Sequence, residues 1–335
     1  MSLKTRTEYK EQQQKKQLDL LFTGFFGKVE GFGCWWDSKT KSWKNYPHIL
    51  THKYSLANLF APIRQEALDY FETNDIAWWR QDEDRYFPSG HLLSSQNHCL
   101  NHLFAIRRDR TAVLKIIKAL CPQIKNILPS PIDNTIRVKN GKVHRFRSYI
   151  SFEFTCANHD LLDENGEKRG KKCTSVDALI YAIDKDGRKI LIPIEWKYTE
   201  AYDKKYRANQ KSIDRYVKYA DLESSNLKQW IGNYEYDPMY EFARQEILME
   251  QIIREHPIAG YGDFKEPFIA DDFIHIIVRP GDNKEIVNDI AEFRKTIVNK
   301  AKLIDVDPKV LIEPLKGIDK YSDLLDYLKT RYWNE

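Results

Sequence analysis

Two carboxylates and an ammonium near the middle of the chain have the spacing of a site that holds a divalent cation. Asp177 lies in one apolar segment, and Glu195 and Lys197 end the next one. Residues two apart on a strand project from the same face, so Lys197 would lie beside Glu195 while Trp196 projects from the other face. The sequence predicts an acid pair beside an ammonium, provided that Asp177 faces Glu195.

The turn between the two segments decides whether the acids face each other. Residues 184–188 (DKDGR) suit a three-residue hairpin loop with the glycine in the left-handed position. That loop makes Asp177 face Glu195. A two-residue loop would instead pair Asp177 with Trp196 and put the acids on opposite faces. The Lys-Asp-Gly order favours the three-residue loop.

Facing carboxylates need an explanation, because at ~5 Å they repel by roughly 3 kcal/mol at an effective dielectric near 20. A bound divalent cation would remove that cost, although charges at strand ends also fit plain solvated termini. The acid-x-lysine pattern recurs in the chain, but only Glu195–Lys197 ends an apolar strand and has a partner acid. Pro193 lacks a ladder donor and fits poorly in a central strand.

The composition is that of a folded chain with room for about two domains. Of its 335 residues, 42% are apolar and 30% charged, and domains average ~150 residues. No apolar run approaches the roughly 18 residues of a membrane span, and residues 1–16 lack the apolar core of a signal peptide. We therefore expect a soluble, cytoplasmic protein with no membrane contact.

Cysteine and histidine give only weak metal-binding patterns. The five cysteines are scattered and never form a CxxC pair, which argues against a disulfide framework and against a zinc ribbon. His98 and His102 are four residues apart on a predicted helix, but no third ligand accompanies them. Ordinary surface or packing histidines are the simpler interpretation.

The net charge is only +4, but basic residues cluster along the sequence. Each cluster alone is typical of a solvated face, and together they favour an anionic polymer as partner. The basic residues that we expect to contact it are Arg137, Lys139, Lys142, Arg145 and Arg147, followed by Lys204, Lys205, Arg207 and Lys211.

Helices and strands can be placed around the candidate acids from hydrophobic periodicity. Alternation over 148–155 predicts a strand that carries Glu153 on the face opposite its apolar residues. Residues 199–237 form a long, mostly helical insertion. The other predicted strands are 174–184, 188–198 and 273–278, and the predicted helices are 91–107, 239–254, one near 284–302 and 319–332. Their order is helix, three strands, helix, strand, then further helices.

At these residues the sequence resembles the PD-(D/E)XK nuclease superfamily, which has the restriction-endonuclease-like fold. The likeness lies in Ser175-Val176-Asp177, in Ile194–Glu200 and in the order of the elements. It implies an α/β fold with an α+β mixed sheet, built on an α-βββ-α-β core. The core would span 88–280, after a mostly helical, aromatic-rich extension at 1–87 and before C-terminal helices at 281–335 packed on it.

The resemblance also implies roles for individual residues. Asp177, Glu195 and Lys197 match the motif, and Ser175 replaces its proline. The two acids and the carbonyl of Trp196 would hold Mg²⁺, with Mn²⁺ as an alternative, while Lys197 orients a water or stabilises developing charge. The resemblance implies less specifically that Glu153 is a third acid and that Gln96 and Gln245 are supporting residues.

The resemblance implies a metal-dependent nuclease that hydrolyses phosphodiester bonds in DNA. The alternative is a non-catalytic module on the same fold that binds nucleic acid or a partner. The sequence does not distinguish a DNA substrate from RNA, or an endonuclease from an exonuclease. It also does not determine the recognition sequence, the biological role, whether the chain forms a homodimer, or the function of residues 1–87.

Overall fold

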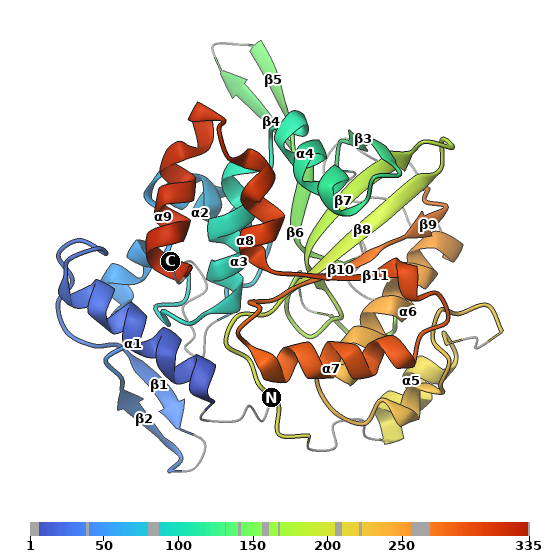
Figure 1. Ribbon diagram of the computed structural model, residues 1–335, viewed down its shortest axis with the longest axis horizontal. Coiled ribbons are helices and arrows are strands. Elements are labelled where there is room, and N and C mark those ends of the chain that lie inside the picture. Colours follow the sequence, from blue (N-terminus) through green and yellow to red (C-terminus); the bar gives the residue numbers. More distant parts are fainter. Residues whose placement is uncertain are drawn as a thin grey trace. The chain divides into compact units, whose positions relative to one another are not determined.

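The computed structural model describes residues 7–37, 40–79, 87–130, 132–139, 142–155, 161–166, 168–204, 210–220, 223–255 and 269–333. They form two compact units (Figure 1). Unit 1 is Ile106–Pro314, and unit 2 combines the described residues before 106 with those after 314.

Unit 1 is built around one mixed sheet. Its antiparallel part is β6, β7 and β8, and the parallel strands β10 and β11 continue the sheet beyond β8. Strands β3 and β6 share one edge of β7, and β9 pairs with β8 next to β10. The strands are β3 Ile124–Leu128, β6 Ile150–Phe154, β7 Val176–Asp184, β8 Lys189–Trp196, β9 Asp272–Phe273, β10 His275–Val278 and β11 Leu303–Val306.

Helices of unit 1 bury the apolar faces of this sheet. Leu179, Leu191 and Ile277 of the sheet pack in one buried cluster with Phe242 and Ile247 of helix α6, because facing residues of paired strands share a face. The helices of unit 1 are α4 Arg110–Leu120, α5 Gln210–Val217, α6 Met239–Glu255, α7 Lys284–Lys295 and α8 Pro308–Ile312. The fold is therefore mixed α/β, with α6 over the face that carries Asp177 and Glu195.

Pro193 lies in β8, between β7 and the β9–β10 side of the sheet. The carbonyl of Leu191 accepts from the N–H of Ile274 at 2.8 Å, and Lys197 donates its backbone N–H to Val278 at 2.8 Å. Alternate backbone groups point the same way, so the nitrogen of Pro193 faces the same side, where Ile274 separates β9 from β10. The missing donor thus coincides with the interruption in the neighbouring strand.

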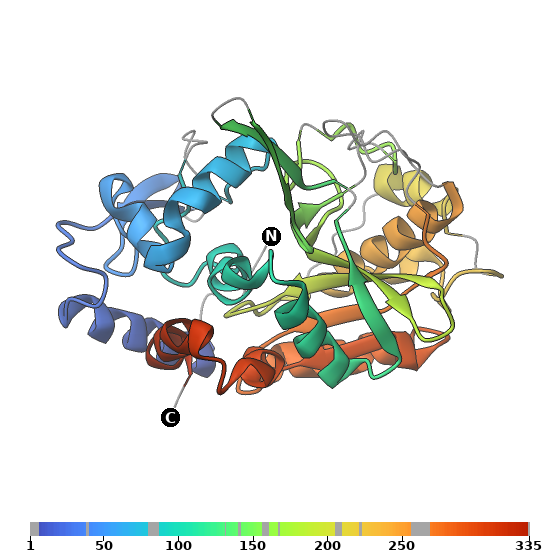
Figure 2. The same cartoon turned by 90° about the horizontal axis from the view of Figure 1, so that it is seen from above.

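A separate antiparallel ribbon, β4 Asn134–Lys139 paired with β5 Lys142–Arg147, belongs to unit 1. It is its own two-stranded sheet, and it extends beyond the main sheet in both views (Figures 1 and 2). The ribbon contains the basic residues Arg137, Lys139, Lys142, Arg145 and Arg147.

In its described residues, unit 2 is mainly helical and includes a β-hairpin. Helix α3 is buried on all sides, and the amide of Asn101 bonds the backbone of Asn58 and Phe60 and the hydroxyl of Tyr332. These bonds tie α3 to the 3₁₀ segment before α2 and to α9. The elements are α1 Glu8–Phe22, β1 Cys34–Asp37, β2 Ser42–Asn45, α2 Arg64–Thr73, α3 Ser95–Leu103 and α9 Ser322–Tyr332.

The boundaries of the two units differ from the predicted domain boundaries at two segments. Helix α3, expected as the first helix of the core, belongs to unit 2, and residues 281–314 belong to unit 1. The described part of the 199–237 insertion contains α5 and a short 3₁₀ turn at Ile231–Asn233. Within the described ranges, no helix combines the length and the apolar character that crossing a membrane requires.

Candidate active site

The hairpin of β7 and β8 places Asp177 opposite Glu195. Ala178 pairs with Ile194 in the antiparallel ladder, and the next position along each strand is Asp177 and Glu195. The loop has three residues, because Asp184 donates its N–H to the carbonyl of Arg188 at 3.0 Å. The structure thus confirms the predicted three-residue loop and its register.

Asp177 is tied to the neighbouring strand through its side chain. Its Oδ2 accepts the backbone N–H of Trp196 at 2.6 Å, and the side chain is only partly exposed. Burial, and next the charge of Glu153, raise the pKa of Asp177 well above its ordinary value. The carboxylate is therefore fixed in a place where its charge is unfavourable.

Glu195 is buried, and both of its carboxylate oxygens are engaged. Oε1 accepts from Nζ of Lys197 at 2.6 Å, and Oε2 accepts from Nε2 of Gln245 at 2.5 Å. Burial, followed by repulsion from Asp177, raises the pKa of Glu195 well above its ordinary value. Since each acid of the hairpin carries an unfavourable charge, a cation that contacted both would stabilise them.

Lys197 lies between two carboxylates. Its Nζ donates to Oε1 of Glu195 at 2.6 Å and to Oε2 of Glu241 at 2.5 Å, and it lies 5.7 Å from the ring centroid of Tyr202. Burial lowers the pKa of the ammonium, but the two carboxylates outweigh it and raise the pKa well above the ordinary value. Lys197 is therefore a protonated donor at neutral pH.

Glu153 extends the row of acids onto β6. Its neighbours Phe152 and Phe154 pair with Ala178 and Val176, on either side of Asp177. Glu153 is buried with φ of +47°, a left-handed conformation that is rare for a residue with a Cβ. Gly170 makes room for it, because a Cβ there would lie 2.7 Å from Oε2 of Glu153.

Helix α6 contributes Gln245 to the same cluster. Its Nε2 also donates to the carbonyl of Ser175 at 3.1 Å, which joins the helix to the start of β7. Its Oε1 is buried and accepts no hydrogen bond in the described part of the chain. A buried acceptor without a donor has a cost, and a cation or a water is a suitable partner for it.

Beyond these residues, the remaining predicted site residues lie elsewhere. Gln96 is in unit 2, where its amide accepts from Trp79 N–H at 2.9 Å and donates to the Ala77 carbonyl at 3.1 Å. Arg147, Lys204 and Lys211 are exposed in unit 1. The others on the ribbon are Arg137, Lys139, Lys142 and Arg145, while Lys205 and Arg207 lie outside the described residues.

Glu241 is a site residue that the sequence analysis missed. It lies one helical turn before Gln245, so both project from the side of α6 that faces the acids. The sequence gives no distinctive signal for it, because polar pairs four residues apart recur along this helix, as at Glu246 and Glu250. The neighbouring Arg244 binds Thr174 Oγ1 at 3.1 Å, which links the same helix to the segment before β7.

The carboxylates do not by themselves form a complete metal site. In the portion of the chain that the structure describes, no group of three or more His, Cys, Asp or Glu side chains is arranged to hold a metal ion. The site offers a facing pair of acids, a neutral amide oxygen and an ammonium between two carboxylates.

The chain belongs to a restriction-endonuclease family. A family model matches residues 4–333, nearly the whole chain. This family is REase-ARP, described as "Restriction Endonuclease associating with ARP", and it points to a nuclease-like function. Comparison with curated proteins and with solved structures gave no match.

Proposed function

We propose that the chain is a Mg²⁺-dependent nuclease of the PD-(D/E)XK type that hydrolyses phosphodiester bonds in DNA. The observation that carries the proposal is the register of β7 and β8, which sets Asp177 against Glu195 with Lys197 beside them. The family match supports a nuclease. The residue types match the short motif at each of the three positions.

The donor set fits a hard divalent cation. Burial raises the pKa of both acids, with repulsion from Glu153 at Asp177 and from Asp177 at Glu195, so a cation between them would stabilise their charged forms. Mg²⁺ prefers carboxylate and carbonyl oxygens and keeps several waters, so it does not need a third acid. The holding groups would be Asp177, Glu195 and the Trp196 carbonyl, with Glu153 and Gln245 next to them. When bound, the cation supplies Lewis-acid polarisation of the phosphodiester.

Lys197 acts as a charged hydrogen-bond donor in this proposal. Its raised pKa excludes a role as general base at neutral pH. An ammonium held by Glu195 and Glu241 is preorganised to orient a water or to stabilise negative charge on the phosphate. Glu241 acts through Lys197 and is a positioning residue.

Exposed basic residues of unit 1 would hold the DNA backbone. Most of the affinity of proteins for DNA comes from Lys and Arg contacts to phosphates and falls with salt. The candidates in the described segments are Arg147, Lys204 and Lys211, together with the basic positions of the β4–β5 ribbon.

The test is cleavage of supercoiled plasmid and of single-stranded DNA by the purified full chain with Mg²⁺ or Mn²⁺. We expect nicking or degradation that EDTA stops and that Lys197→Ala abolishes. Cleavage that continues unchanged in Asp177→Asn would rule the mechanism out.

A second candidate role is a non-catalytic module that binds nucleic acid or a protein partner. The family description names an association with ARP, which supports the partner-binding part of this candidate. It predicts salt-sensitive binding of nucleic acid without cleavage in the presence of any metal, and it predicts that Glu195→Gln leaves this binding unchanged. The same plasmid assay, run beside a binding assay, separates the two roles.

A further inference from the structure

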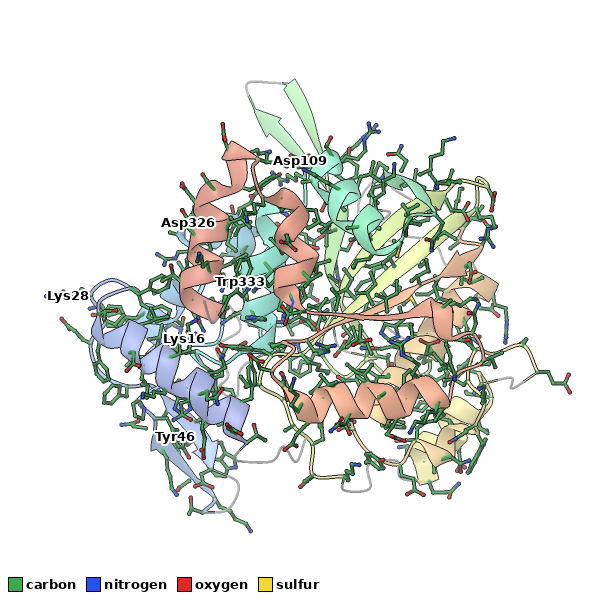
Figure 3. All side chains as sticks on the ribbon, viewed as in Figure 1. Lys16, Lys28, Tyr46, Asp109, Asp326 and Trp333 are labelled. Atoms are coloured by element: carbon green, nitrogen blue, oxygen red, sulfur yellow. The ribbon has the colours of Figure 1, made fainter. Side chains whose placement is uncertain are left out.

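The β1–β2 hairpin of unit 2 has two faces with different surroundings. Trp36 pairs directly with Trp43, and Trp35 pairs with Lys44. Because side chains alternate along a strand, Trp36 and Trp43 share one face and Trp35 and Lys44 share the other. Tyr46, labelled in Figure 3, follows the end of β2 and marks the hairpin there.

The Trp35 face holds the hairpin to the rest of unit 2. The ring of Trp35 lies 5.1 Å from that of His91 in an edge-to-face contact. Lys44 forms an ion pair with Asp37 at 2.5 Å, which joins the two strands of the hairpin. The contact between Trp35 and His91 is therefore what attaches this face to the rest of unit 2.

The Trp36 face leaves part of its aromatic surface in contact with solvent. Trp36 is 40% exposed and Trp43 is 47% exposed, although their rings contact each other edge to face at 5.8 Å. Exposed adjacent indoles are unusual, since Trp supplies large apolar area and is enriched where proteins bind other molecules. Pairing of two aromatic side chains across strands does not by itself require that they be 40% or more exposed.

The charge around the indoles favours a polyanion. Residues 28–53 contain five lysines against one Glu and one Asp, a net charge of +3 (5 − 2). Lys41 is exposed in the turn that precedes β2, two residues before Trp43. Basic groups beside open aromatic rings are the combination that binds single-stranded nucleic acid, because every base has a π-face that stacks.

We propose that the Trp36–Trp43 face binds single-stranded nucleic acid, with unpaired bases stacked on the indoles and Lys41 close to the phosphates. The proposal rests on the proposed nuclease function for its choice of a nucleic acid over a protein partner. It gives unit 2 a role in holding substrate.

The experiment measures binding of a fluorescein-labelled oligo(dT) to the full chain in EDTA, where no cleavage occurs. We expect Trp43→Ala to weaken binding about tenfold or more and Trp43→Phe, which keeps an aromatic ring, to bind close to wild type. Trp79→Ala is the matched control, because Trp79 is also 47% exposed in unit 2 but is not on the hairpin. It should bind like the wild type.

A variant that leaves the aromatic pair intact guards against a folding artefact. Lys41→Asn removes one charge, and asparagine tolerates the left-handed backbone at this position, where φ is +50°. Its binding should depend less steeply on salt, with an unchanged melting temperature. Wild-type affinity in Trp43→Ala, or equal losses in Trp43→Ala and Trp79→Ala, would overturn the proposal.

The binding assay in EDTA and the cleavage assay with Mg²⁺ together separate this proposal from the proposed nuclease function. If Trp43→Ala loses binding and the wild type does not cleave DNA, the nuclease function is contradicted and the hairpin site is supported. If cleavage needs Asp177 and Trp43→Ala binds like the wild type, the nuclease function is supported and the hairpin site is contradicted.

Discussion

The carboxylate of Asp177 accepts the backbone N–H of Trp196 at 2.6 Å. The β7–β8 ladder has Ala178–Ile194 as its last pair in this direction, so a side chain takes over where backbone pairing ends. The hydrogen bond fixes Asp177 relative to the strand that carries Glu195 and Lys197. The acid pair is thereby held close although each charge is unfavourable.

Asp177→Asn should raise the stability of the metal-free protein and abolish cleavage. The folded-state pKa of Asp177 is raised, so the charged form costs stability at neutral pH. The asparagine oxygen can still accept from Trp196. We expect a gain of about 1 to 2 kcal/mol, seen as a melting temperature several degrees higher in EDTA. Any increase in melting temperature that Mg²⁺ gives the wild type should disappear.

Two further variants test the reason for that gain. Asp177→Ala removes the acceptor of the Trp196 N–H as well as the charge, so it should be less stable than Asp177→Asn. Asp186→Asn, in the exposed hairpin loop, should leave both stability and cleavage unchanged. If Asp177→Asn has a lower melting temperature than the wild type in EDTA, the charge of Asp177 does not destabilise the metal-free protein.

Glu241→Gln should slow cleavage with little effect on DNA affinity. The variant removes one of the two carboxylates that hold the Lys197 ammonium, so the ammonium is less precisely placed. Positioning residues of this kind typically contribute 10- to 100-fold. Single-turnover cleavage rates and binding in EDTA measure the two effects separately. Glu255→Gln, at the exposed end of the same helix, is the control, and an equal loss in both variants would contradict the role of Glu241.

The hairpin at the site was predictable because its determinants are local. The Asp-Gly sequence of its turn and the alternation of two apolar strands fix the register, and the register fixes which acids meet. Gly187 has φ of +85°, as the three-residue loop requires. No tertiary information was needed for this part of the site.

Gly187→Ala tests how strongly that turn holds the register. A Cβ at Gly187 would have nothing within 4 Å, so the cost is backbone strain alone, about 1 kcal/mol. We expect a slightly lower melting temperature and unchanged cleavage, because the ladder from Ala178 to Ile183 keeps the register. Gly187→Asn should lower the melting temperature less than Gly187→Ala does, since asparagine tolerates this backbone conformation. A loss of cleavage in either variant would show that the turn alone sets the register.

The parts of the site that sequence reasoning missed depend on tertiary packing. Glu241 reaches Lys197 across 44 positions in the chain, and nothing local indicates which turn of α6 faces the sheet. The interruption between β9 and β10 opposite Pro193 is a property of a neighbouring strand, so Pro193 looked misplaced in its own segment. Charged residues interrupt the alternation in ribbon β4–β5, so its sequence indicates only a basic cluster.

Glu250 should make the stability of unit 1 depend on pH. Burial, with repulsion from Glu246, raises its pKa from 4.5 to about 7, although Asn226 and Ser225 donate to it. Between pH 4.5 and 7 the folded state binds more protons than the unfolded state, so this group's contribution to stability falls as pH rises. The loss is complete above pH 7 and amounts to roughly 3 kcal/mol.

Glu250→Gln, which mimics the protonated acid, isolates this contribution. The difference in melting temperature between the variant and the wild type should be near zero at pH 4.5 and should grow to several degrees in favour of the variant by pH 8. Glu255→Gln should show no such trend. A difference that stays constant with pH would mean that Glu250 is not the titrating group.

The β4–β5 ribbon should contact DNA through one of its faces. In the register of the ribbon, Arg137 pairs with His144 and Lys139 with Lys142, whereas Arg145 pairs with the apolar Ile136. A two-stranded ribbon fits the major groove of a DNA duplex, and each phosphate contact adds about 0.9 to the slope of log affinity against log salt. Arg137→Ala should therefore weaken duplex binding and lower that slope by about one, while Arg145→Ala should do so less. The measurement is a salt titration of duplex binding in EDTA. Equal slopes for wild type and Arg137→Ala would exclude the ribbon as a phosphate contact, because a lost ion pair with DNA necessarily releases fewer counterions.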